Sequence, residues 1–264
     1  MKSVLLAFFL SILVVNQSRA NDAPLVAAAS SLRQVWPLLM AAYAPEKNPR
    51  ITFGSSGNLS RQILQSAPFE LFLSADQSYS EQLYIQGKSI DEPTPYTIGV
   101  LAWVALPQTP LAHWLNRSTD PVSPTDDINT KPSFPFTDIK NLAIANPAFA
   151  PYGRAAMQAL QANGVNKQSS IKFNMGENAA QTLQFALSGA TGGGIVPLSL
   201  VTGLATQQLP KIIVSKIAPT MHAPLIHSMV LIDTPSSSAT SLFNFLLSEQ
   251  AQQIFEQHGF SAIN

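Results

Sequence analysis

The stretch GSSGNL at residues 54–59 follows an apolar, strand-like run at residues 51–53 and opens a predicted helix. A second stretch, AASSL at residues 28–32, stands in the same relation to the apolar run that begins at Leu25. The first N–H groups of a helix lack intrahelical partners and carry partial positive charge, and a serine at this place adds an O–H donor. Two such helix starts that face one point would hold a small oxyanion without any lysine or arginine.

Strands and helices alternate along the rest of the chain. Apolar runs predict strands at residues 25–29, 51–54, 70–74, 97–106, 142–146, 171–174, 193–196, 211–217 and 225–232. Helical spacing of apolar residues predicts helices at residues 32–43, 59–65, 80–86, 154–161, 179–187, 198–205 and 238–257. Pro37 kinks the first of these helices or delays its start. This alternation indicates an α/β fold of βαβ units, with mainly parallel sheets and a ligand site beyond the carboxyl ends of the strands.

The first 20 residues have the form of an export signal peptide. Lys2 precedes an apolar stretch at residues 4–15, and Ser18-Arg19-Ala20 supplies small residues before a cleavage site after Ala20. The apolar stretch is too short for a membrane anchor. The absence of cysteine excludes a lipoprotein anchor, disulfides and thiol chemistry. We therefore expect an exported protein whose mature chain is long enough for two domains.

Charged side chains are scarce and balanced. The chain has 15 Lys and Arg against 15 Asp and Glu, and only 11% of its residues are charged, whereas a globular domain usually has about 25%. Nucleic-acid binding requires a basic stripe, so this balance argues against a nucleic-acid partner.

Catalytic and metal-site motifs are incomplete. Asn58 breaks the G-x-S-x-G pattern around Ser56, and the glycine-rich run at residues 189–194 lacks the Lys-Ser/Thr of a P-loop. The four histidines show no metal-ligand spacing, and surface or interdomain roles are expected for His222 and His227. An exported serine hydrolase remains an alternative, in which Ser56 would act with one of these two histidines and a carboxylate behind it.

The motifs taken together resemble those of the periplasmic molybdate-binding proteins of ABC transporters. The resemblance spans nearly the whole mature chain and rests on AAASSL at residues 27–32, FGSSGNLSRQI at 53–63, APFELFLSAD at 67–76, IANP at 144–147, APYG at 150–153, ENA at 177–179, GIV at 194–196, AQQIF at 251–255 and HGF at 258–260. It implies a two-lobed periplasmic-binding-protein fold, with mixed sheets flanked by helices and the ligand in the interlobe cleft.

The resemblance also implies how the chain is divided. Lobe I would comprise residues 21–97 and 222–264, and lobe II would comprise residues 98–221. Within lobe II, the stretch 107–138 is rich in Pro, Ser, Thr and Asp, and we expect it to be a surface excursion with little regular structure.

Five residues match the positions of the family's oxyanion donors. The resemblance implies that Ser30, Ser31 and Ser56 donate through side chains and backbone N–H groups. Tyr152 would donate through its phenol, and Ala179 through its backbone N–H. Molybdate is fully deprotonated at neutral pH, so a site made only of donors suits it, whereas a protonated phosphate would leave its own O–H unpaired.

Carboxylates would oppose an anion, so Asp76 and Glu177 are expected outside the ligand shell. Asn178 and Asp76 are candidates for support of the site, Asp76 as a helix cap or near the hinge. No catalytic residue, cofactor or metal is expected, other than molybdenum within the bound oxyanion.

The expected ligand is molybdate or tungstate, and cavity size would decide against the alternative, sulfate. The implied partner is an inner-membrane ABC permease, and the expected form is a periplasmic monomer. A sensor role without transport remains an alternative.

Overall fold

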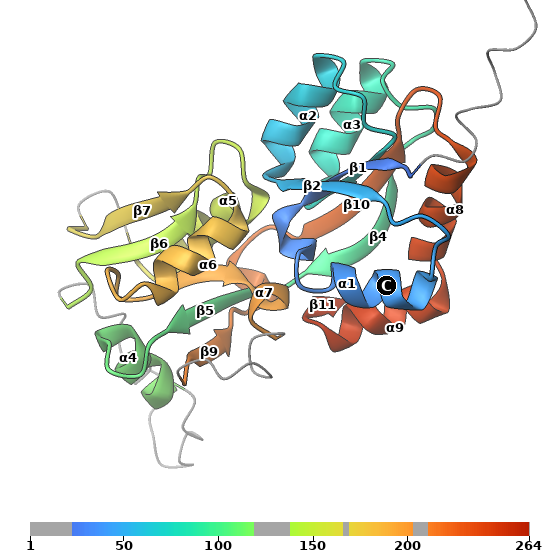
Figure 1. Ribbon diagram of the computed structural model, residues 1–264. Helices are drawn as coiled ribbons and strands as arrows, with labels where there is room; N and C mark the ends of the chain where they lie inside the picture. The colour runs from blue at the N-terminus through green and yellow to red at the C-terminus, as the bar shows by residue number, and fades with distance from the viewer. Residues whose placement is uncertain (1–22, 119–137, 166–168, 203–210, 264) are drawn as a thin grey trace, which may run out of the picture.

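The computed structural model describes residues 23–118, 138–165, 169–202 and 211–263 and has two mixed sheets flanked by helices (Figure 1). The two sheets and their helices form the two lobes of the expected α/β fold. The predicted export signal at residues 1–20 lies outside the described ranges, as do residues 119–137 of the Pro-rich stretch.

The first lobe is built on a six-stranded sheet of order β11-β4-β10-β3-β1-β2. Its strands are β1 (Leu25–Ala29), β2 (Arg50–Gly54), β3 (Leu71–Ser74), β4 (Thr94–Gly99), β10 (Leu225–Leu231) and β11 (Phe260–Ser261). β1 pairs in parallel with β2 and β3, whereas β10 runs antiparallel to β3 and β4, and β11 runs antiparallel to β4.

Helices cover both faces of this sheet. Since side chains alternate along a strand, Val26 and Ala28 face α1 (Trp36–Tyr43), α8 (Ser237–Leu246) and α9 (Glu249–Gln257). Ala27 faces the other side, where α2 (Ser56–Leu64) and α3 (Gln77–Ile85) pack. Val26 and Ala28 therefore belong to one apolar core and Ala27 to another, while Ala29, at the end of β1, joins the core of the second lobe.

The second lobe is built on a five-stranded sheet of order β7-β6-β8-β5-β9. Its strands are β5 (Leu101–Ala105), β6 (Asn141–Ala145), β7 (Lys172–Gly176), β8 (Gly194–Pro197) and β9 (Ile213–Lys216). β6 is parallel to β7 and β8, and β5 is antiparallel to β8 and β9. The helices of this lobe are α4 (Pro110–Ser118), α5 (Pro151–Ala162), α6 (Ala179–Leu187) and α7 (Leu198–Thr202).

The expectation of mainly parallel sheets was wrong, because strands enter each sheet in both directions. The single strand predicted at residues 97–106 is two strands, β4 and β5, which belong to different sheets. The chain passes between the sheets there, and it passes back between β9 and β10, where the short 3-10 helix η2 (Pro219–Met221) lies. A continuous apolar run shows that a segment is buried but not which sheet buries it.

Two predicted helices have different bounds in the structure. The helix predicted from Leu32 begins at Trp36, after a 3-10 turn, η1 (Ser30–Leu32), and Pro37 lies in its first turn, where a missing N–H costs nothing. The helix predicted at residues 238–257 is divided into α8 and α9, because Ser248 caps a new helix by accepting a hydrogen bond from the Ala251 N–H.

The start of the Pro-rich stretch is more regular than predicted. α4 occupies its first part and buries Leu111, Ala112 and Leu115 in the core of the second lobe. The ring of Trp114 packs edge-on against that of Trp103 at a centroid distance of 5.7 Å. The four of these residues on α4 (Leu111, Ala112, Trp114 and Leu115) have helical spacing, but the prolines nearby masked this pattern in the sequence.

Gly153 allows α5 to pack closely on the end of β6. A Cβ at this position would lie 2.2 Å from the backbone oxygen of Ala145. Alanine gains about 1 kcal/mol of helix propensity over glycine, but overpacking against a rigid backbone costs roughly 1–3 kcal/mol. We therefore expect Gly153→Ala to lower the free energy of unfolding by up to about 2 kcal/mol, measured by urea denaturation.

Gly192→Ala is the matched control for this variant. Its Cβ would meet no atom closer than 3.4 Å, so the free energy of unfolding should change by no more than about 0.5 kcal/mol. Equal losses in the two variants would contradict the close contact between α5 and β6.

Candidate functional site

The residues predicted to bind an oxyanion meet at one small cavity between the two sheets. Ser30 and Ser31 directly follow β1, and Ser56 is the first residue of α2 after β2. From the other lobe, Tyr152 is the second residue of α5 and Ala179 is the first residue of α6. A cavity of about 10 Å³ contacts all of them, and its other lining residues are Ala29, Gly54, Ser55, Ala75, Ala150 and Pro151.

This cavity is buried and uncharged. The five predicted residues are all no more than 4% exposed, and none of the described residues that line the cavity carries a charge. Asn178 accepts hydrogen bonds of 3.1 Å from the Ala180 and Gln181 N–H groups, so its cap does not use the N–H of Ala179. The wall of the cavity therefore offers hydroxyl and N–H donors and no carboxylate.

Two serine hydroxyls at the cavity lack partners. Ser31 Oγ and Ser55 Oγ are buried and form no hydrogen bond of normal geometry with any described residue. Burial raises the pKa of Tyr152, and the nearby Ser31 hydroxyl opposes this effect. A buried polar group left unpaired costs about 1–3 kcal/mol, so such groups are retained where a ligand can satisfy them.

The other two serines have partners that leave a proton free. Ser56 Oγ accepts a hydrogen bond of 2.9 Å from the Ala75 N–H, and Ser30 Oγ lies 3.4 Å from the Ala180 nitrogen of the opposite lobe. Each hydroxyl acts as acceptor in its contact, so its own O–H can donate to a third group.

His227 lies between the two lobes, which is the second of the two roles, surface or interdomain, expected for it from the sequence. Its ring is fully buried, with Nδ1 at 3.3 Å from the Tyr96 hydroxyl and Nε2 at 3.2 Å from the Tyr152 hydroxyl. Burial lowers the pKa of His227 to about 3, although the charge of Asp76 acts to raise it. The ring is therefore neutral at pH 7, and a surface role is wrong for this histidine, which connects β10 to α5.

The contacts of the histidines do not favour the serine hydrolase. Within the described ranges, no hydrogen bond joins Ser56 to a histidine, because both ring nitrogens of His227 face tyrosines. The Nδ1 atom of His222 lies 2.8 Å from the backbone oxygen of Ala223. A nucleophilic serine needs a base within hydrogen-bond reach.

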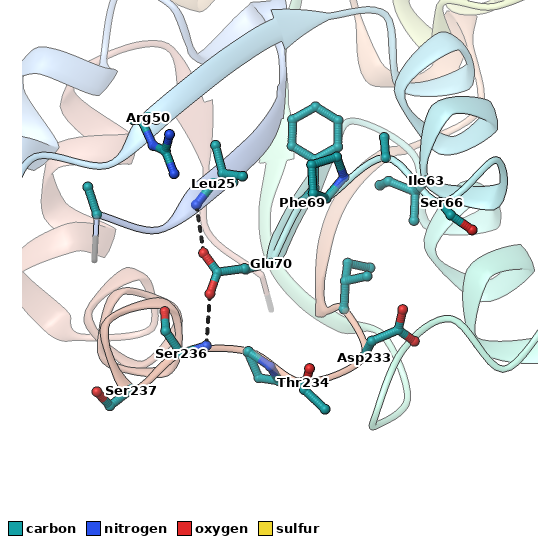
Figure 2. A pocket seen from close by; sticks show the side chains of 15 residues that line it. Leu25, Arg50, Ile63, Ser66, Phe69, Glu70, Asp233, Thr234, Ser236 and Ser237 are labelled. Atoms are coloured by element: carbon teal, nitrogen blue, oxygen red, sulfur yellow. Dashed lines mark hydrogen bonds between the residues drawn. The ribbon is translucent and has the colours of Figure 1, made fainter. Parts of the chain in front are cut away.

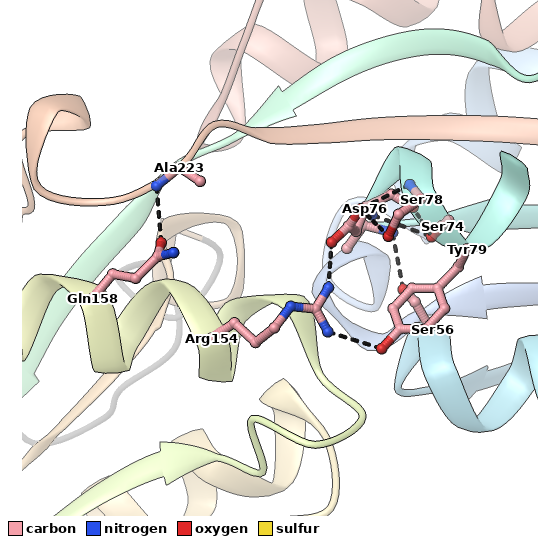
Figure 3. Close-up of polar contacts among 9 residues, drawn as sticks. Ser56, Ser74, Asp76, Ser78, Tyr79, Arg154, Gln158 and Ala223 are labelled. Atoms are coloured by element: carbon pink, nitrogen blue, oxygen red, sulfur yellow. Dashed lines mark hydrogen bonds and ion pairs between the residues drawn. The ribbon is translucent and has the colours of Figure 1, made fainter. Parts of the chain in front are cut away.

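Asp76 lies beside the cavity but outside its lining, and it contacts both lobes. Its carboxylate caps α3 by accepting from the Ser78 N–H at 2.8 Å, and it forms an ion pair with Arg154 of α5. Arg154 also donates a hydrogen bond of 2.8 Å to the Tyr79 hydroxyl (Figure 3). Arg154 and Tyr79 were not predicted from the sequence, since nothing local marks residues 75 positions apart as partners.

A larger cavity, of about 600 Å³, lies at the other end of the strands of the six-stranded sheet, away from the small cavity. There Glu70 accepts hydrogen bonds of 2.9 Å from the Leu25 and Ser236 N–H groups (Figure 2). Leu25 is the first residue of β1, Glu70 directly precedes β3, and Ser236 directly precedes α8, so the cavity faces the amino ends of the parallel strands. Ligands of α/β sheets bind at the carboxyl ends, and the carboxylate of Glu70 would repel an anion.

Within the described ranges, no group of three or more histidine, aspartate or glutamate side chains could hold a metal ion. None of the helices in those ranges has the length and apolar character needed to cross a bilayer.

Ser31→Ala and Ser56→Ala should differ in their effect on the free energy of unfolding of the ligand-free protein. Ser56→Ala leaves the buried Ala75 N–H unpaired and should lower the free energy of unfolding by about 1–3 kcal/mol. Ser31→Ala removes a hydroxyl that has no partner and should change that free energy by less than about 0.5 kcal/mol. Urea denaturation without oxyanion measures both, and equal losses would contradict the contacts described.

Acid should destabilise the protein through His227. An exposed histidine has a pKa of 6.5 and the folded one about 3, so between these values the unfolded chain binds a proton that the folded chain does not. The free energy of unfolding should therefore fall as the pH falls through this window, by up to about 1.4 kcal/mol per pH unit. Urea denaturation from pH 7 to pH 4.5 should show a smaller loss in His227→Gln, and parallel curves would rule out a neutral buried ring.

Comparison with known proteins shows relatives of similar sequence. The molybdate-binding protein ModA of Rhodobacter capsulatus is 30% identical over 214 residues, which are 79% of this chain and 75% of the relative. ModA of Escherichia coli is 26% identical over 260 residues, which are 96% of this chain and 94% of the relative. These matches confirm the resemblance that the motifs predicted.

Solved structures show the same fold. The periplasmic molybdate-binding protein of Azotobacter vinelandii superposes with a TM-score of 0.73 at 22% identity, over 91% of this chain and all of that one. The sulfate-binding protein SubI of Mycobacterium tuberculosis has a TM-score of 0.65 at 14% identity, over 92% of this chain and 87% of that one. The family of bacterial extracellular solute-binding proteins matches residues 24–261, and this chain belongs to that family.

Proposed function

We propose that this chain captures molybdate in the cleft between its lobes and delivers it to an ABC permease. The observation that carries the proposal is the buried cavity where serine, tyrosine and backbone donors from both lobes converge without a charged side chain. The relatives named molybdate-binding proteins support the choice of oxyanion. No catalytic step is part of this function, and the chain is not an enzyme.

Hydrogen bonds alone supply sufficient affinity. A hydrogen bond to a charged acceptor contributes about 1.5–3 kcal/mol net. Four to six such bonds leave roughly 10 kcal/mol after the cost of ordering, which corresponds to a dissociation constant of tens of nanomolar. Ser31 and Ser55 give up no hydrogen bond of normal geometry when they bind the anion.

Binding requires a small movement of the lobes. The cavity of about 10 Å³ has room for about one water molecule, and a tetrahedral oxyanion is larger. We infer that the lobes open and then close on the anion, which favours the closed state because it touches Ser31 and Ser56 on one side and Tyr152 and Ala179 on the other. The moving lobes would be those expected from the sequence, except that Ile98 and Gly99 are part of β4 and would move with the first lobe.

Tungstate has the same charge and shape as molybdate and should share the site. Sulfate has the same charge but shorter bonds from its central atom, so the donors would close on it less completely. The protein would act as a periplasmic monomer after removal of residues 1–20.

Isothermal titration of the purified protein should show one site for molybdate and tungstate, with sulfate bound at least tenfold more weakly. Ser31→Ala should lower the affinity for molybdate about tenfold, because one hydrogen bond to a charged acceptor is lost, while its unfolding is unchanged. Equal affinity for sulfate would contradict selection by cavity size. Wild-type protein that binds none of the three anions would refute the function.

A further inference from the structure

We propose that His227 is a positioning residue, which turns the Tyr152 hydroxyl so that its proton points at the bound anion. This role rests on the proposed function, since it concerns one donor of the same site. It follows from a chain of three buried polar groups that ends at the cavity.

The three groups come from separate elements. Tyr96 lies on β4, His227 on β10 and Tyr152 on α5, and they are at most 3% exposed. The imidazole is 3.3 Å from one phenol through Nδ1 and 3.2 Å from the other through Nε2. The ring of Phe260 packs edge-on against it at a centroid distance of 5.3 Å. The imidazole is therefore held in place by contacts on several sides.

The available protons allow two hydrogen-bond arrangements of Tyr96, His227 and Tyr152. A neutral imidazole has one donor and one acceptor nitrogen. If Nδ1 carries the proton, Tyr152 must donate its own O–H to Nε2, and the phenol has no proton left for a ligand. If Nε2 carries the proton, His227 donates to the Tyr152 oxygen, Tyr96 donates to Nδ1, and the Tyr152 O–H is free to donate.

The anion selects the second arrangement. With the proton on Nε2, the dipoles of Tyr96, His227 and Tyr152 all point their positive ends towards the cavity. Hydrogen bonds aligned in this way polarise one another in a medium of low dielectric constant. A dianion at the cavity therefore stabilises the arrangement that supplies it with a donor.

The backbone around His227 makes room for this contact. A Cβ on Gly99 would lie 2.1 Å from the Tyr152 hydroxyl and 3.0 Å from Nε2 of His227, so glycine at this position leaves their shared space open. The pairing of β10 with β4 changes register between His227 and Ser228, and such irregularities re-aim side chains. Gly99 is the last residue of β4, where the chain leaves the six-stranded sheet, and His227 lies near the start of β10, where the chain enters it again.

A double-mutant cycle tests the proposal. Titration with molybdate compares wild type, His227→Leu, Tyr152→Phe and the double variant. We expect each single variant to lose about tenfold in affinity, and the double variant to bind no more weakly than Tyr152→Phe, since His227 acts only through that phenol. His227→Gln, whose amide can place an N–H where Nε2 lies, should recover most of the loss. His222→Leu, a histidine that does not contact Tyr152, should bind as wild type does.

Three results would overturn the proposal. They are unchanged affinity in His227→Leu, losses that add fully in the double variant, and no recovery in His227→Gln. If wild-type protein binds molybdate but any of these is found, only the positioning role fails. If wild-type protein does not bind molybdate, the proposed function fails instead.

A measurement on the intact protein covers the case in which His227→Leu does not fold. Nitrogen-15 NMR of the imidazole in the molybdate complex should show a protonated Nε2 and an unprotonated Nδ1. The opposite tautomer would overturn the proposal without any variant.

Discussion

Donors that stay unpaired inside the protein are the constraint on which the rest of this structure depends. The hydroxyls of Ser31 and Ser55 are buried without partners, and Tyr152 is buried beside them. Such groups lower stability until an acceptor arrives, and a doubly charged oxyanion is an acceptor on every side. The two-lobed architecture allows these groups to be exposed to the ligand in an open state and covered in a closed one.

The placement of charge follows from the same constraint. A carboxylate at the cavity would repel an anion, and Asp76, which follows the lining residue Ala75, forms an ion pair with Arg154 and caps α3. Glu70 lies at the opposite edge of the sheet, where it pairs with backbone N–H groups. The neutral state of His227 keeps the buried side of the cavity free of full charges.

The contacts between the lobes gather around the cavity. Ser199 of α7 donates a hydrogen bond of 2.8 Å to the backbone oxygen of Ser31, and the Gly57 N–H donates to the backbone oxygen of Phe149 at 3.0 Å. Arg154 reaches from α5 to Asp76 and Tyr79 (Figure 3). Each of these bonds is modest, and the part-exposed ion pair is weakened by solvent, so the closed state can open without a large cost.

The sequence by itself determined the local parts of this protein. Strand-to-helix turns were readable from apolar runs followed by small hydroxyl residues, and α6 begins and ends where its pattern predicted. The motifs at those turns resemble those of the family, and this resemblance implied five of the residues that line the cavity. These features depend on neighbours within a few positions, which is the range over which periodicity and capping act.

Only the tertiary structure decided how distant segments pair. β10 lies between β3 and β4 although about 125 to 160 residues separate the paired positions in the chain, and this makes the sheet mixed and buries His227 against Tyr96 and Tyr152. The pairing of Asp76 with Arg154 has the same origin. Their partners are chosen by the packing of whole sheets, which no local pattern in the sequence records.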